Sequence, residues 1–235
     1  MADVLCLFKA EIMKMNILDS IQNRIIICMT FVYDLRTIIY PLRLQTKYYK
    51  QLIKNAKIEN GFKILDIGCG TGILGIILKE VYGDSIEYFA IDPKKYVVKA
   101  ARIKAVNNNC DFKILSGKIE NIPFKDKSFD VIFCNLVVHH LPMDILKTGL
   151  SEIRRVLKSK ANLLIFDYCP TSSLVHYIMF IITYIWTSIH EYGKVLFKGK
   201  MVVYLEEEEF SDINVSQISS LLPLAIYRAK NASNK

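Results

Sequence analysis

The sequence predicts an α/β fold built on a doubly wound, mostly parallel sheet. From residue 63 onward, short apolar runs alternate with longer segments in which apolar residues recur at helical spacing. The runs lack polar alternation, as in Val131-Ile132-Phe133, which is typical of parallel strands buried on both faces. With 235 residues, 52% hydrophobic and 23% charged, the chain has the length of one domain with a full core and is not a disordered protein.

The elements follow from these runs in chain order. The predicted strands cover residues 63–67, 86–91, 112–116, 129–135 and 161–167, and the predicted helices cover 71–82, 94–107 and 144–157. The last helix ends in Arg154 and Arg155, basic residues that suit the negative end of a helix. Two further apolar runs, 210–215 and 223–228, predict a closing pair of strands.

Residues 1–60 predict an N-terminal helical cap ahead of the sheet. Apolar and basic positions alternate there at helical spacing, as in 40–44 and 48–53, and Asn60-Gly61 breaks the pattern. We expect two or three helices in this cap, and the sheet in residues 61–235.

An apolar helical insertion is predicted at about residues 171–200. Residues 171–190 contain no Asp, Glu, Lys or Arg, so length alone would admit a membrane-spanning helix. Spanning would place strand runs of one sheet on opposite sides of a bilayer, which argues against it. A buried helix, a lid over the substrate and a helix lying in a membrane interface all stay open.

Charge and cysteine usage suggest the environment of the protein. The formal net charge is +8, but the lysines are spread through the chain, which favours a solvated surface and no nucleic-acid partner. An anionic membrane surface, contacted through 171–190, is the alternative. The six cysteines form no C-x-x-C pair, and no cleavable signal opens the chain. We expect a cytoplasmic protein, with peripheral membrane contact as the alternative, and no metal site.

A glycine-rich turn follows the first strand and has two interpretations. Residues 70–75 fit G-x-G-x-x-G, and Asp92 lies about twenty residues further on, as in a nicotinamide-dinucleotide site. Residues 66–72 fit D-x-G-x-G-x-G, which adds a carboxylate at the strand end. Because Asp66 would repel a pyrophosphate and attract a cationic ligand, it favours the second interpretation.

Residues 66–72 resemble motif I of the class I S-adenosylmethionine (SAM) dependent methyltransferases. Four further segments match the pattern of that family, namely 91–93, 117–124, 129–141 and 153–158. The chain looks most like the small-molecule enzymes grouped with the quinone-biosynthesis C-methyltransferases. The resemblance implies a seven-stranded Rossmann-like methyltransferase sheet with an antiparallel last strand. It also implies a SAM-binding domain over 61–235, with S-adenosyl-L-methionine as cofactor.

The resemblance also implies which residues bind the cofactor. In the family, the acid at Asp66 orients water and backbone around the methionine part of SAM, and the acid at Asp92 accepts hydrogen bonds from both ribose hydroxyls. The segment around Ile119 embraces the adenine, and an amide at the end of a parallel strand, here Asn135, faces the ligand crevice. The predicted set is Asp66, Gly68, Cys69, Gly70, Gly72, Asp92, Pro93, Ile119 and Asn135. A nucleophilic Cys69 is the alternative for that residue, but no histidine lies near it in sequence.

Two positions depart from the family pattern. Lys118 stands where the family commonly has an Asp that accepts from the adenine amino group, and an ammonium cannot accept that hydrogen bond. Either Lys118 turns to solvent and SAM affinity falls by about 1 kcal/mol, or SAM binding is lost and the protein is a scaffold. The usual Pro-Gly-Gly turn is replaced by Ser159-Lys160-Ala161, a loop change that need not affect chemistry.

His139 and His140 are the candidate catalytic residues. They follow the fourth strand where, in the family, the loop meets the methyl group, and a histidine there could take a proton from the acceptor. Helix capping or packing against the pocket wall is the other interpretation. The sulfonium donor is already activated, so a base is needed only when the acceptor arrives protonated.

The sequence therefore predicts SAM-dependent methyl transfer by in-line displacement to a small, apolar acceptor. The apolar segment 171–200 and the N-terminal helices would cover that acceptor. Two other hypotheses stay open: a phospholipid head-group methyltransferase at a membrane surface, and a catalytically inactive methyltransferase-like scaffold.

Overall fold

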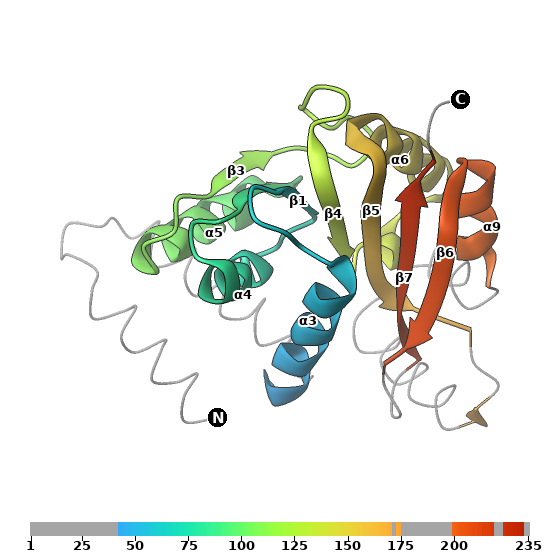
Figure 1. The fold of residues 1–235 in the computed structure, drawn as a ribbon, viewed down its shortest axis with the longest axis horizontal. Coiled ribbons are helices and arrows are strands. Elements are labelled where there is room, and N and C mark those ends of the chain that lie inside the picture. Colours follow the sequence, from blue (N-terminus) through green and yellow to red (C-terminus); the bar gives the residue numbers. More distant parts are fainter. Residues whose placement is uncertain (1–41, 171–172, 175–198, 219–222, 233–235) are drawn as a thin grey trace.

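The computed structural model describes residues 42–170, 173–174, 199–218 and 223–232. They form a seven-stranded sheet in the order β3-β2-β1-β4-β5-β7-β6 (Figure 1). The strands are β1 (Lys63–Ile67), β2 (Glu87–Asp92), β3 (Lys113–Ser116), β4 (Phe129–Asn135), β5 (Leu157–Tyr168), β6 (Phe210–Gln217) and β7 (Leu224–Asn231). The α-helices are α3 (Leu42–Ala56), α4 (Ile73–Tyr82), α5 (Lys95–Asn107), α6 (Met143–Val156) and α9 (Lys200–Glu207), and η1 (Val138–His140) is a single 3₁₀ turn.

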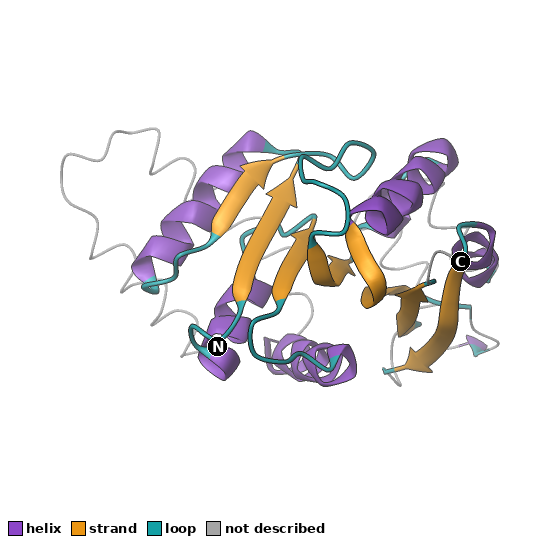
Figure 2. Cartoon of the chain, turned by 45° about the horizontal axis from the view of Figure 1, so that its top comes forward, coloured by secondary structure: helices purple, strands orange, loops and turns teal. Residues whose placement is uncertain are grey.

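The sheet confirms the predicted fold class. The first five strands pair in parallel, and β7 runs antiparallel to both of its neighbours, β5 and β6. Helices lie on both sides of the sheet (Figure 2). The apolar runs of β1 and β4 are almost wholly buried, as expected for central strands covered on two faces.

The topology fixes where a ligand can bind. The chain builds β1, β2 and β3 toward one edge and then returns to place β4 on the other side of β1. The switch point therefore lies between β1 and β4, which pair in parallel from Ile64↔Val131 to Ile67↔Cys134. In open α/β sheets, ligands bind outside the carboxyl ends of the strands at such a point.

The turn that leads from α6 into β5 differs from the prediction. β5 begins directly at Leu157, where α6 ends, rather than at residue 161. The substituted turn residue Lys160 lies within the strand with φ 61°, a left-handed conformation that glycine adopts more easily. The pairing of β4 with β5 shifts register between Phe129 and Val131, which accommodates this irregular start.

Some of the predicted segments lie outside the described residues. Of the predicted N-terminal cap, the structure describes α3, which contacts β5, β7 and α4. Residues 1–41 and most of the predicted insertion, 175–198, lie outside the described ranges. Within the ranges that are described, no helix combines the length and the apolar character needed to cross a bilayer.

Candidate functional site

The glycine turn joins β1 to α4 at the switch point. Gly68, Gly70 and Gly72 all have positive φ angles, of 68°, 55° and 79°. At Gly68 an added Cβ would lie 2.3 Å from Cγ2 of Val137, so this position excludes any larger side chain. Gly75 brings α4 close to the sheet, because a Cβ there would lie 2.7 Å from the Tyr88 ring. The positive backbone angles and the close packing therefore explain why the turn is rich in glycine.

Backbone groups of the turn bind β2. The amides of Gly68 and Cys69 both donate to the carbonyl of Ile91, at 2.8 and 3.1 Å. The amide of Gly70 donates to Oδ2 of Asp92 at 3.1 Å. The two motifs that the sequence places 22 residues apart are thus joined directly.

Asp92 is buried at the carboxyl end of β2. Its Oδ1 accepts a 2.9 Å hydrogen bond from the amide of Lys94, two residues on across Pro93. Burial raises the pKa of Asp92, and the hydrogen bonds from Lys94 and Gly70 oppose that shift. Each carboxylate oxygen has two lone pairs, so both oxygens retain the capacity to accept a ligand hydroxyl.

Asp66 is 2% exposed, and only one of its two carboxylate oxygens has a hydrogen-bond partner. Its Oδ2 accepts a 2.7 Å hydrogen bond from the hydroxyl of Tyr88, whereas its buried Oδ1 has no hydrogen-bond partner. Burial raises the pKa of Asp66 to about 7; the Tyr88 hydrogen bond lowers it and the charge of Asp92 raises it further. A buried acceptor without a donor is costly unless a ligand supplies one.

Asn135 ends β4, the strand that pairs with β1. Its Oδ1 is also buried and without a hydrogen-bond partner. The switch point is therefore flanked by two unsatisfied acceptors, one from Asp66 and one from Asn135.

Cys69 lies half-buried within the turn, with its Sγ 3.6 Å from the carbonyl oxygen of Gly70. Burial, and then the charges of Asp66 and Asp92, raise the pKa of this thiol far above its ordinary value. The thiol is therefore not a ready nucleophile at neutral pH. Its role as a backbone contact to the cofactor stays a prediction.

The loop after β3 starts beside Asp92, since the amide of Gly117 donates to the Asp92 carbonyl at 3.2 Å. Ile119 is buried against Gly149 of α6. The Lys118 side chain is 68% exposed and lies 3.5 Å from Glu120. Of the two outcomes that its sequence position allows, this geometry favours the one in which the ammonium turns to solvent.

His139 is buried and bonded to Asp167 at the end of β5. The amide of His139 donates to Oδ2 of Asp167 at 3.3 Å, and its Nδ1 lies 2.7 Å from Oδ1 of the same carboxylate. A carboxylate can only accept, so Nδ1 carries the hydrogen, and Nε2 is left to accept a proton in that tautomer of the imidazole. The Tyr168 ring packs edge-on against His139 at a centroid distance of 5.2 Å. His140 is exposed, and its ring centroid lies 4.0 Å from that of His139.

Sequence reasoning missed Tyr88 and Asp167. Both lie in apolar strand runs. Tyr88 bonds the predicted site residue Asp66, 22 positions away, and Asp167 bonds His139, 28 positions away. The only available signal was that Asp167 is a lone carboxylate near the end of a strand, which is where site residues of α/β sheets gather.

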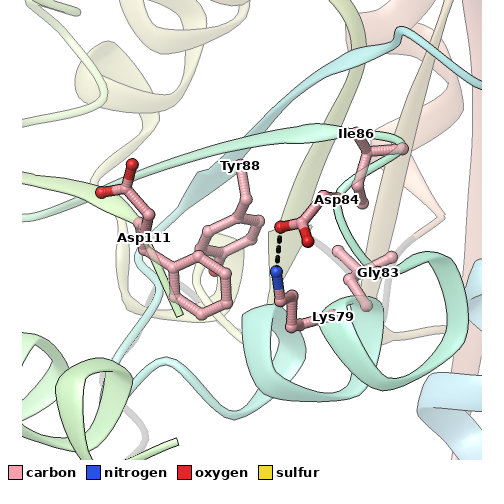
Figure 3. A pocket seen from close by; sticks show the side chains of 8 residues that line it. Lys79, Gly83, Asp84, Ile86, Tyr88 and Asp111 are labelled. Atoms are coloured by element: carbon pink, nitrogen blue, oxygen red, sulfur yellow. Dashed lines mark hydrogen bonds and ion pairs between the residues drawn. The ribbon is translucent and has the colours of Figure 1, made fainter. Parts of the chain in front are cut away.

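A small cavity of about 40 Å³ has Tyr88 among its lining residues (Figure 3). None of the lining residues belongs to the glycine turn. An ion pair between Lys79 and Asp84 forms part of its wall. It is lined by Leu78, Lys79, Gly83, Asp84, Ile86, Tyr88, Asp111 and Phe112. The volume suits a water molecule and is too small for a nucleoside.

Comparison with known proteins finds similarity to methyltransferases over the middle of the chain. Residues 64–160 match the family model described as a methyltransferase domain. A demethylmenaquinone methyltransferase of a Geobacillus species is 30% identical over 127 residues, which are 54% of this chain and 53% of that protein. An uncharacterized methyltransferase of Bacillus subtilis, YcgJ, is 31% identical over 121 residues, 51% of this chain and 46% of that protein. The chain thus spans about half the length of the curated relatives it matches.

Solved structures agree on the fold. A SAM-dependent methyltransferase from Aquifex aeolicus aligns with a TM-score of 0.64 and 20% identity, covering 85% of this chain and 98% of that one. Of the two interpretations of the glycine turn, these similarities favour the methyl donor. Together with the sheet order, they show the fold of the class I methyltransferases, and the chain is similar in sequence to the methyltransferase domain family, over residues 64–160, and to a demethylmenaquinone methyltransferase.

Proposed function

We propose that the protein transfers a methyl group from SAM to a small, apolar acceptor. The observation that carries this proposal is the pair of buried, unpartnered oxygens at the switch point, Asp66 Oδ1 and Asn135 Oδ1. Both are acceptors, and the methionine part of SAM offers three ammonium N–H donors and two positive charges. A dinucleotide would bring a pyrophosphate, which offers only acceptors and negative charge.

Residues of the chain suit each of the three parts of SAM: the methionine part, the ribose and the adenine. Asp66 would hold the cationic methionine part, while the backbone of Gly68 to Gly72 lines its approach. Asp92 would accept from the ribose hydroxyls, and Ile119 would cover the adenine. When bound, SAM supplies a methyl group already activated by its sulfonium, so the protein has to align the acceptor and exclude water.

We assign His139 the role of general base for an acceptor that arrives protonated. Its bond to Asp167 leaves Nε2 as the acceptor, and the carboxylate would stabilise the imidazolium that forms when Nε2 takes a proton. His140 is the second candidate, because it is exposed and packs on the His139 ring. Which of the two receives the proton depends on where the acceptor binds.

The proposal that the acceptor is lipophilic rests on two features. The sequence around 171–190 is free of Asp, Glu, Lys and Arg, and with the N-terminal cap it would form a lid over the acceptor. The curated relatives include demethylmenaquinone methyltransferases, whose names give an apolar quinone as their acceptor. Contact of the 171–190 segment with a membrane surface would give access to such an acceptor.

The test is to incubate the purified protein with methyl-tritiated SAM and a cell extract, and to follow the label. We expect label in the organic phase, in a neutral lipophilic molecule. Label in phospholipid head groups would replace the proposal by the head-group hypothesis, and label in a polar fraction would overturn the apolar acceptor while keeping the enzyme.

A second experiment separates the enzyme from the scaffold. Lys118→Asp restores an acceptor at the position that commonly binds the adenine amino group. In a working pocket we expect it to tighten SAM binding several-fold, about the value of one hydrogen bond. No SAM binding by either the wild type or the variant would support the scaffold instead.

A further inference from the structure

The loop of residues 117–126 has little structure of its own. It leaves β3 with the Gly117 bond to Asp92, and it contains one isolated bridge, Lys118↔Asn121. If the proposed function is correct, this loop covers the adenine of SAM, and its position affects SAM affinity.

Two charged residues of α6 bind this loop at its backbone. The amide of Ile122 donates to Oε2 of Glu152 at 2.9 Å, and the Ile122 carbonyl accepts from Nη2 of Arg155 at 2.9 Å. Nη1 of Arg155 donates to the carbonyl of Phe124 at 2.9 Å and to Oδ1 of Asp126 at 2.7 Å. Both backbone polar groups of Ile122 are therefore satisfied by one helix.

The two α6 residues also fix each other. Nε and Nη2 of Arg155 donate to the two carboxylate oxygens of Glu152, at 2.7 and 2.8 Å. The bond from Arg155 lowers the pKa of Glu152, and Glu152 and then Asp126 raise that of Arg155. The pair is thus charged throughout the physiological range, and bidentate geometry makes it rigid.

A third contact lies about one turn earlier on the same helix. A Cβ added to Gly149 would lie 2.8 Å from Cγ1 of Ile119, so the helix and the loop meet at van der Waals distance there. Helix α6 therefore holds the loop at Ile119, Ile122, Phe124 and Asp126, beginning two residues after the Gly117 bond to Asp92.

We propose that Glu152 and Arg155 are positioning residues for SAM: they hold the 117–126 loop in the conformation that binds adenine. This inference rests on the proposed function. Neither residue needs to touch SAM. Without the pair, the loop samples other conformations, and the apparent Kd rises in inverse proportion to the fraction that stays competent.

The test compares two neighbouring arginines. Arg155→Met removes the three Arg155 bonds to the loop, at Ile122, Phe124 and Asp126. Arg154→Met instead removes an ion pair from the same helix to Glu209, which is far from the loop in sequence. We expect Arg155→Met to raise the calorimetric Kd for SAM about tenfold, as when one loop in ten stays competent. Hydrogen exchange should accelerate at 118–124. Arg154→Met should change neither quantity, and Arg155→Lys should recover part of the affinity.

Gly149→Ala provides an independent variant, because it displaces Ile119 without altering any charge. We expect it also to weaken SAM binding, with hydrogen exchange elsewhere in the sheet unchanged. Equal Kd values for Arg155→Met and Arg154→Met, with a wild type that binds SAM, would overturn this inference alone. A wild type that binds no SAM would overturn the proposed function as well.

Discussion

The hydroxyl of Tyr88 donates to one oxygen of Asp66 at 2.7 Å, while the other oxygen of Asp66 is buried with no hydrogen-bond partner. Tyr88 thus fixes the orientation of the carboxylate and leaves one acceptor for a ligand. Burial raises the pKa of Asp66 to about 7, so the unliganded protein holds a proton there over much of the acidic range. Binding a cation at this site must then expel that proton.

SAM affinity should depend on pH through Asp66. Below about pH 7 the carboxyl is protonated, and each further pH unit should weaken SAM binding about tenfold. Tyr88→Phe removes a hydrogen bond that lowers the pKa, so it should move the midpoint to higher pH. Calorimetric Kd values measured over roughly pH 5.5 to 8.5, a range that spans the midpoint, test the wild type and Tyr88→Phe. A pH-independent Kd would contradict this role of Asp66.

Asp66 should also destabilise the unliganded fold at alkaline pH. Its pKa is about 7 when folded and near 3.8 when unfolded, so the folded state binds the proton more tightly. The free energy of unfolding therefore falls as pH rises from about 4 to 7, and stays low above that. Asp66→Asn should raise the stability of the unliganded protein at pH 8, by about 1 kcal/mol or more, and much less at pH 5. Urea unfolding at both pH values measures this, and a variant that is less stable at pH 8 would refute it.

Much of the fold could be predicted from the sequence, because apolar runs and helical periodicity are local signals. The limits of β4 and the start of β6 agree with the prediction, and β1 to β3 agree within one residue at each end. The start of β5 was wrong by four residues, because the sequence lacks a turn signal at Ser159-Lys160-Ala161 and the backbone accommodates Lys160 in a left-handed conformation instead.

The site was predictable only where a motif marks it. The turn at Asp66 to Gly72 and the acid at Asp92 are local patterns, and the structure brings them together through the Gly70 amide. Tyr88 and Asp167 carry no such pattern, since each acts through a side-chain bond to a residue on another element. Pairs of that kind depend on strand register, which the sequence does not display.

Substitutions at Gly68 and Gly61 distinguish two free-energy costs of replacing a glycine: the strain of a positive φ and the steric overlap of the added Cβ. Both have positive φ, but a Cβ at Gly61 meets nothing within 4 Å, whereas at Gly68 it would overlap Val137. Gly61→Ala should cost about 1 kcal/mol from its backbone angle alone. Gly68→Ala should cost roughly 2 to 4 kcal/mol, because overpacking adds to that angle.

Val137→Ala in the Gly68→Ala background should recover part of the loss, because it removes the atom that the new Cβ meets. Thermal or urea unfolding of the single and double variants gives the coupling. Additive losses, with no recovery in the double variant, would show that the Val137 contact is not the cause.

The bond between His139 and Asp167 should matter for rate more than for SAM affinity. Asp167→Asn can leave the ring in the other tautomer, and loss of a general base lowers the rate by about a hundredfold or more. We expect this drop in methyl transfer from tritiated SAM, with an unchanged Kd for SAM. His140→Ala is the matched control on the exposed ring. If His140→Ala showed this loss of methyl-transfer rate and Asp167→Asn did not, His140 would be the base in place of His139.

The most direct measurement is a calorimetric titration of the purified wild type and Asp66→Asn with SAM at pH 8, with NADH as the comparison ligand. We predict one SAM bound per chain, at least about tenfold weaker binding in Asp66→Asn because a charge-assisted contact is lost, and no heat from NADH. Binding of NADH in place of SAM, or SAM binding that does not change in Asp66→Asn, would contradict the assignment of the glycine turn to the methyl donor.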